Sequence, residues 1–338
     1  MLNELGIKAE PVLVNSTGLD DGFDNRLPEP QLFDHVLVRA NIDGASYWLD
    51  GTLPAVAAPS LRPVFPVRWV LPLSAAGRAI ENLGWRPATT PDEIHLFEID
   101  ARDGFDKPAR IVTTDITRGA PGLQQQIEYS AASAAQLLDV YRQRAIGDVF
   151  QAIDDVQWRY DQKADASILV ITGRGKINWE NGVDGALSYG LPGGGFTPPE
   201  RRVRASDPDT SIPFYSKPEY ACYVTTVRTP SATRQAQWTS KGDIDQDYFG
   251  KHYHRAWEFR DGAIRMVHGS RVEQPEIDPV TAERDNARIS AFDNSMGYIF
   301  YDPHRRDGAI GSGKKVPATY ELDWTADDVP CLSSRSGK

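Results

Sequence analysis

Long apolar runs and basic clusters are scarce in this sequence of 338 residues. No stretch approaches the roughly 20 consecutive apolar residues that a membrane-spanning helix requires, so we expect no transmembrane segment. The 37 lysines and arginines are outnumbered by 47 aspartates and glutamates, which gives a net charge of −10. Such a surface repels phosphate backbones, and no basic run with interleaved aromatic residues offsets it, so the sequence disfavours nucleic-acid binding.

Cysteines and the N-terminal residues give little information on where the protein works. The two cysteines, Cys222 and Cys331, are too few to identify a reducing or an oxidising compartment. Residues 1–5 contain an acidic and no basic residue, and no apolar run follows them. They therefore do not resemble a signal peptide.

The most informative stretch is a predicted β-hairpin. Residues 33–38 and 47–52 each have a strand-like pattern, and the Asp43-Gly44 pair between them is typical of a tight hairpin turn. Pairing of the two strands brings His35 beside Asp50. A carboxylate beside a histidine fixes its tautomer and stabilises its charged form, which makes the pair the base and orienter of a nucleophilic site. The simpler alternative is a polar pair that only satisfies its own hydrogen bonds.

Three stretches in this order, residues 1–14, 33–38 and 47–52, resemble the second half of a bacterial transglutaminase-like core. The resemblance is to the subgroup that carries domains of unknown function on both sides of that core. It implies that His35 and Asp50 are the catalytic histidine and aspartate. It also implies that residues 1–5 end the helix that starts at the catalytic cysteine.

That cysteine has no counterpart in this sequence. By the resemblance, the chain begins about three to four helical turns after its place. We therefore expect the chain alone to be inactive. We also expect the truncated core either to be marginally stable or to hold a partner at the face left bare by the missing helix.

The sequence divides into four predicted segments, because its length is sufficient for two or three hydrophobic cores. We expect an α+β protein that starts with a partial transglutaminase-like, papain-like core at residues 1–68. A linking α+β segment at 69–165 and an antiparallel, sandwich-like β domain with a late helix at 166–302 follow. Residues 303–338 are predicted to be a loosely held tail. Antiparallel strands are favoured because no helices separate the strands of the third segment.

Local patterns predict the elements of these segments. A hairpin is expected to join residues 94–99 to 110–116. An apolar stripe between residues 130 and 155 predicts two short helices or one bent helix, with a cap at Ser130 or Ser133. Asp278 and Pro279 predict the start of the late helix. Short strands are predicted at residues 166–171, 176–179, 186–189, 201–205, 220–228, 235–240, 252–259 and 263–272.

Several other residues invite a chemical interpretation. Gly173-Arg174-Gly175-Lys176 lacks the spacing of a phosphate-binding loop, so we predict a hairpin turn. His252 and His254 share one face of a strand, as metal ligands can, but no third ligand is spaced nearby, and we expect no metal site. No cofactor motif is present. Cys222 lies in a strand-like run and is predicted to be a buried structural residue.

Two aromatic residues near these patterns have open roles. Trp48, two residues before Asp50, is either a core aromatic or a wall of the cleft that contacts substrate. His95 is most simply a polar strand residue.

Two functions are consistent with the sequence. The first is acyl transfer or hydrolysis of protein or peptide amides by a Cys-His-Asp triad, with the cysteine outside this chain. The second is a non-catalytic module that binds envelope components or has a structural role. Relatives of this architecture are typically exported in Gram-negative bacteria, so the resemblance implies a periplasmic or exported protein.

Overall fold

Strands dominate the structure, which is a computed structural model. It describes residues 2–16, 23–24, 29–53, 63, 67–144, 149–204, 211–292, 296–311, 313–326 and 329–333. Three α-helices occur among these residues: α1 (Gly119–Ser130), α2 (Ala134–Arg144) and α3 (Pro279–Arg288). The predicted α+β class with a papain-like core is therefore wrong, and the fold is β-rich. No helix in the described part of the chain is both long and apolar enough to cross a bilayer.

The N-terminal part is a small antiparallel sheet that follows a short 3-10 helix at Asn3–Leu5. Its five strands lie in the order β3-β2-β1-β4-β5. Their bounds are β1 Lys8–Val14, β2 His35–Ile42, β3 Ala45–Leu49, β4 Trp69–Pro72 and β5 Glu81–Asn82. Alternate residues of the strands point inward, so Val12, Val14 and Leu37 are buried together.

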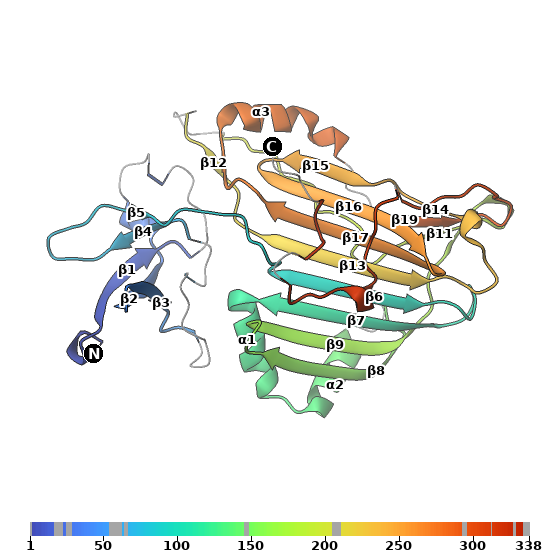
Figure 1. The fold of residues 1–338 in the computed structure, drawn as a ribbon, viewed down its shortest axis with the longest axis horizontal. Coiled ribbons are helices and arrows are strands. Elements are labelled where there is room, and N and C mark those ends of the chain that lie inside the picture. Colours follow the sequence, from blue (N-terminus) through green and yellow to red (C-terminus); the bar gives the residue numbers. More distant parts are fainter. Residues whose placement is uncertain are drawn as a thin grey trace.

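A twisted sheet of eight strands forms the larger part of the molecule, with the N-terminal sheet beside it (Figure 1). The strand order is β15-β16-β17-β13-β6-β7-β9-β8. Their bounds are β6 Glu93–Asp100, β7 Ala109–Arg118, β8 Ala152–Asp161, β9 Ala166–Gly175, β13 Tyr220–Arg228, β15 Ile244–Tyr248, β16 Lys251–Arg260 and β17 Ala263–Val272. The predicted hairpin over residues 94–116 is confirmed as β6 and β7.

One pair in this sheet, β6 with β13, is parallel, and the other pairs are antiparallel. This pair joins the predicted linking segment to the predicted β domain. The predicted border between residues 165 and 166 falls in the β8–β9 hairpin, so it separates no sheets. Backbone pairing across this border joins strands from both predicted segments in one eight-stranded sheet.

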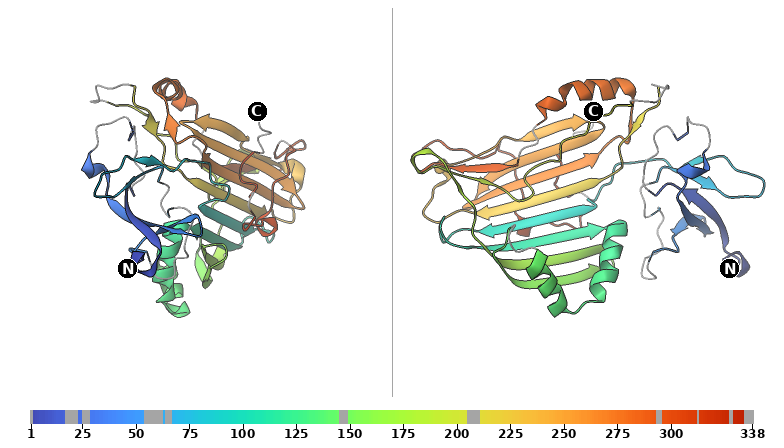
Figure 2. Two further views of the ribbon diagram at one scale, coloured as in Figure 1. Left: turned by 60° about the vertical axis from the view of Figure 1, so that its left-hand side comes forward. Right: turned by 180° about the vertical axis from the view of Figure 1, so that it is seen from behind.

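One face of the large sheet, here called the helix-covered face, carries Ile99, Val227 and Trp257. Leu137 of α2 and Trp238 pack in the same core. Seen from behind, α1 and α2 lie over β8 and β9 (Figure 2). A second sheet also covers this face, in the order β10-β11-β19-β14. Its strands are β10 Glu180–Asn181, β11 Leu187–Gly190, β14 Trp238–Ser240 and β19 Tyr298–Tyr301, and a further pair is β12 Phe214–Tyr215 with β18 Glu276–Ile277.

The opposite face, here called the tail-covered face, carries Cys222 and Val224. Val316, Val329 and Cys331 of the C-terminal segment are almost fully buried against it. This segment crosses in front of the sheet in Figure 1. For the described residues of 303–333, the prediction of a loosely held tail is therefore wrong, because their apolar side chains complete a core that the strands alone leave exposed.

Some local predictions are wrong, two of them because a strand has the apolar spacing or the glycine content of another element. Residues 152–156 belong to β8 rather than to a helix. A β-bulge between Ile153 and Asp155 lets Ile153 and Val156 face the same core, which reproduces a helical spacing. Gly173 and Gly175 lie inside β9 and not in a turn. Glycine is required at position 173 because a Cβ there would overlap the carbonyl oxygen of Ala152 on the neighbouring strand β8. Residues 201–204 form no strand.

The late helix begins as predicted. The side chain of Asp278 accepts a hydrogen bond from the backbone nitrogen of Thr281 at 2.8 Å, and Pro279 occupies the first helical position. Ser133, one of the two predicted caps, likewise accepts from the nitrogen of Gln136 at 3.3 Å at the start of α2.

Candidate functional site

The predicted hairpin is present and places the candidate pair. Asp43 and Gly44 both have positive φ, 50° and 81°, as a tight hairpin turn requires. β2 begins at His35, and Asp50 directly follows β3. Nε2 of His35 lies 2.8 Å from Oδ2 of Asp50, so the predicted contact is confirmed. The catalytic role of the two residues stays a prediction.

Asp50 is held rigidly as an ionised carboxylate. Its side chain is 2% exposed, and that of His35 is 18% exposed. Oδ1 accepts hydrogen bonds from the backbone nitrogen of Thr52 at 2.9 Å and from its hydroxyl at 2.7 Å. Burial raises the pKa of Asp50, but the hydrogen bonds from Thr52 and His35 outweigh it and leave the pKa below its ordinary value. Because an ionised carboxylate only accepts, His35 donates from Nε2.

This chain contributes no thiol to the pair. Its two cysteines, Cys222 and Cys331, form a disulfide with Cα atoms 5.6 Å apart, and both are fully buried. The prediction that Cys222 is a buried structural residue is confirmed. The sequence alone did not identify its partner.

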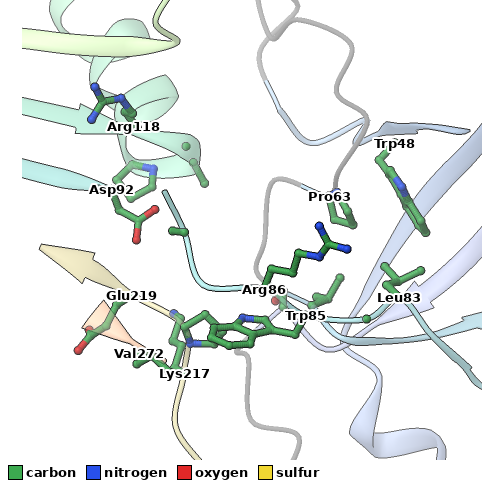
Figure 3. A pocket seen from close by; sticks show the side chains of 18 of the residues that line it. Trp48, Pro63, Leu83, Trp85, Arg86, Asp92, Arg118, Lys217, Glu219 and Val272 are labelled. Carbon is green, nitrogen blue, oxygen red and sulfur yellow. The ribbon is translucent and has the colours of Figure 1, made fainter. Parts of the chain in front are cut away.

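A pocket of about 930 Å³ lies between the N-terminal sheet and the large sheet. Trp48, Trp85 and Arg86 line one side, and Asp92 and Glu219 lie on the other (Figure 3). Neither His35 nor Asp50 is among the described residues that line it. The pocket is therefore distinct from the His35–Asp50 pair.

Trp48 is 8% exposed and packs in the N-terminal core, which is one of its two predicted roles, and it also lines the pocket. The guanidinium of Arg39 lies 5.7 Å from its ring centre, and Arg39 is fixed by Glu10 and Glu81, each at 2.6 Å. This network makes the pocket wall rigid. Contact of Trp48 with a substrate stays a prediction.

A second group of polar residues crosses the helix-covered face of the large sheet. Strand register places Asp115, His95, Tyr223 and His268 side by side on four neighbouring strands. Nδ1 of His95 is 2.6 Å from Asp115, and the ring of Tyr223 stacks between the two imidazoles at 4.6 and 5.0 Å. No local sequence pattern indicates this row, because it depends on the parallel pairing of β6 with β13.

The two imidazoles of this row hold opposite protonation states at neutral pH. Burial lowers the pKa of His95, but hydrogen bonds to Asp115 and Glu93 outweigh it and raise the pKa to about 9. Burial lowers the pKa of His268 to about 3, and its Nδ1 donates to the carbonyl of Gly193 at 2.7 Å. Tyr223 and His268 line a pocket of about 480 Å³. His95 is thus an ion-paired group and more than a polar strand residue.

The prediction that no third ligand lies near His252 and His254 is wrong. Asp245 of the neighbouring strand β15 pairs directly with His254 of β16. The ligand atoms of the three side chains lie within 4.8 Å of one another. Sequence spacing could not reveal this group, since Asp245 approaches from another strand.

No protein-family model and no curated protein matches this chain. One crystal structure resembles it weakly, that of a "putative protease" from Parabacteroides distasonis. The two share 14% identity with a TM-score of 0.33, and the match covers 89% of this chain and 41% of that one. The chain thus spans less than half the length of that protein, and a likeness at this level carries no argument about function.

Proposed function

We propose that His35 and Asp50 are the base and the orienting acid of a transglutaminase-like site that acts on protein or peptide amides. The observation that carries this proposal is the 2.8 Å contact between Nε2 of His35 and a buried, ionised Asp50. Such a carboxylate fixes the imidazole tautomer and stabilises its charged form. The resemblance of residues 1–14, 33–38 and 47–52 to a transglutaminase-like core supports the assignment.

The chemistry requires a cysteine thiol that this chain does not supply. Because Asp50 engages Nε2, the thiol proton passes to Nδ1 of His35, and the thiolate attacks the amide carbon. The carbon–nitrogen bond then breaks, and the imidazolium returns the proton to the leaving amine. Water or a second amine finally breaks the thioester.

The first test compares two proteins: this chain, and the chain preceded by whatever its gene encodes upstream in frame. We expect amine incorporation into glutamine-containing peptides and peptide hydrolysis at background rates for this chain, because its cysteines are bonded to each other. We expect activity in the extended protein. In that protein, His35→Ala should lower activity at least about 100-fold, the scale of general acid–base catalysis.

A matched control is His304→Ala, which changes an exposed histidine outside the candidate sites. It should leave activity unchanged. Two results would contradict the proposal: an upstream frame without a cysteine-bearing helix, or full activity in the extended His35→Ala protein. Turnover by this chain alone would show that another residue is the nucleophile.

We also propose that the protein is exported, as its relatives by resemblance are. The Cys222–Cys331 disulfide supports this location, because disulfides persist mainly in oxidising compartments. Alkylation of free thiols in protein taken from intact cells tests it. Labelling of both cysteines without prior reduction would oppose the proposal.

A second candidate function is binding without catalysis. The pocket of about 930 Å³ favours it, since its volume lies within the range of ligand sites and aromatic and charged side chains line it together. Trp48, Trp85 and Arg86 would contact an extended peptide or glycan there (Figure 3). Binding that is lost in Trp85→Ala but kept in His35→Ala would favour this function over the first.

A further inference from the structure

The edge of the large sheet that carries β15 and β16 brings together three groups with metal-binding chemistry. His252 and His254 are two residues apart on β16, so their side chains share one face. Asp245 of β15 pairs with His254 in the register of the two strands. The imidazole rings lie nearly parallel with centres 6.4 Å apart.

His252 is arranged as a metal-binding histidine. Its Nδ1 lies 2.9 Å from the carboxylate of Asp247, and its Nε2 lies 3.5 Å from that of Asp245. We assign the proton to Nδ1, donated to Asp247 at the shorter distance. Nε2 then presents a lone pair toward Asp245. A carboxylate that orients a histidine through its other nitrogen is the usual support of a metal ligand.

One ring nitrogen of His254 makes no hydrogen bond within the described part of the chain. It is 4% exposed, and its Nδ1 is buried without a hydrogen-bond partner among the described residues. Buried polar atoms almost always have a partner, and leaving one without costs about 1–3 kcal/mol. This atom is therefore an independent sign that the cluster has a ligand of its own.

The C-terminal segment forms a cover over one side of the cluster. Asp245, His254, Gly269 and Cys222 lie in one cross-strand row. The disulfide fastens Cys331 over this row, and Gly269 leaves the space for its backbone. The hydroxyl of Ser333 then reaches to 3.3 Å from Nε2 of His252. The side chain of Asp245 is 45% exposed, so the cluster opens to solvent on that side.

We propose that Asp245, His252 and His254 bind one divalent transition-metal ion of the zinc class. Two imidazoles and a carboxylate are a frequent ligand set for zinc, with a fourth position open to water or another ligand. The two nitrogen ligands disfavour calcium and magnesium, which prefer oxygen. Zinc ligands lie about 3.5 Å apart when each is about 2.1 Å from the ion. The ligand atoms of the three side chains lie within 4.8 Å of one another, and Nε2 of His252 and the carboxylate of Asp245 are already 3.5 Å apart.

The test is binding of Zn²⁺ and Co²⁺ to the full, metal-free chain, without a polyhistidine tag and with the disulfide intact. Calorimetry should give one Zn²⁺ per chain, and Co²⁺ should show the visible absorption of a four-coordinate site. Asp245→Asn and His254→Gln should each weaken Zn²⁺ binding at least about 100-fold, because each removes a ligand. Asp247→Asn should weaken it about 10–100-fold, since it removes only the support of His252.

His304→Gln is the matched control, because it removes an exposed histidine outside the cluster and should leave the affinity unchanged. Asp245 is exposed, so Asp245→Asn should keep the fold, which circular dichroism checks. The proposal fails if the wild-type chain binds no stoichiometric Zn²⁺ or if Asp245→Asn and His254→Gln bind as tightly as the wild type. A Co²⁺ spectrum that His304→Gln abolishes would also overturn it.

Discussion

The six histidines of this chain show how far the surroundings of a residue decide its chemistry. His35 contacts a buried carboxylate at a strand end, and His95 forms an ion pair within a sheet. His268 is buried and neutral, and its proton is donated to the backbone carbonyl of Gly193. His252 and His254 face a third potential ligand. The residue type alone therefore assigns none of these roles.

His95 should make the stability of the protein depend on pH. The folded state raises its pKa from 6.5 to about 9, so its contribution is complete below pH 6.5 and is lost as the pH rises through 9. At about 1.4 kcal/mol per pKa unit, the contribution is at most about 3.5 kcal/mol. Denaturant unfolding of the wild type and His95→Gln from pH 6 to 10 measures it. The two curves should converge at high pH, and a constant difference would show that His95 contributes by packing alone.

At the scale of elements, the C-terminal segment shows the largest difference between the predicted and the observed structure. Its polar composition predicted a loose tail, yet Val316, Ala318, Val329 and Cys331 are nearly inaccessible. Arg265, buried beneath it, is paired with Glu321 at 2.7 Å. Apolar residues, the Arg265–Glu321 ion pair and one disulfide thus hold on the sheet a segment whose described residues contain no strand and only one short 3-10 helix, at Thr319–Glu321.

Gly269 should be essential for this docking. A Cβ at this position would overlap the carbonyl oxygen of Cys331, so Gly269→Ala must displace the segment. We expect a loss of about 1–3 kcal/mol in the free energy of unfolding, the usual cost of overpacking. Gly242→Ala is the control, because nothing lies within 4 Å of its added Cβ and its change should stay within about 0.5 kcal/mol. Equal stability of the two variants in denaturant unfolding would contradict the observed docking.

At the scale of the whole molecule, the large sheet unites segments that the sequence separates. β6 and β7 come from the predicted linking segment, and β9, β13, β16 and β17 come from the predicted β domain. The parallel contact between β6 and β13 extends over eight residue pairs, which makes it a central part of the sheet. Residues 93–272 should therefore unfold as one cooperative unit.

Cutting the β8–β9 turn tests this unity. A specific protease site inserted at residues 162–165 allows cleavage between the two strands, and the disulfide does not bridge the cut. We expect the two pieces to elute together in gel filtration under native conditions, because β9 remains paired with β7 and β8. They should separate only in denaturant. Elution of two independent folded pieces from the nicked native protein would favour the predicted border at residue 165.

The sequence determined the features that depend on short-range patterns. The Asp43-Gly44 turn predicted the hairpin that joins His35 to Asp50, and Asp278 with Pro279 predicted the start of α3. The strands β13 and β17 were predicted with their observed bounds. These features were accessible because turn geometry, capping and strand alternation act within about ten residues of the chain.

Only the tertiary structure decided the features that depend on which strands are neighbours. The parallel pairing of β6 with β13 brings His95 against Tyr223, and the pairing of β15 with β16 brings Asp245 to His254. Pairing of Cys222 with Cys331 depends on a segment 109 residues away. Strand order and register follow from the summed burial of whole faces, so a local pattern leaves them open. For this reason the His35–Asp50 pair was predicted, whereas the cluster of Asp245, His252 and His254 emerged only from the folded sheet.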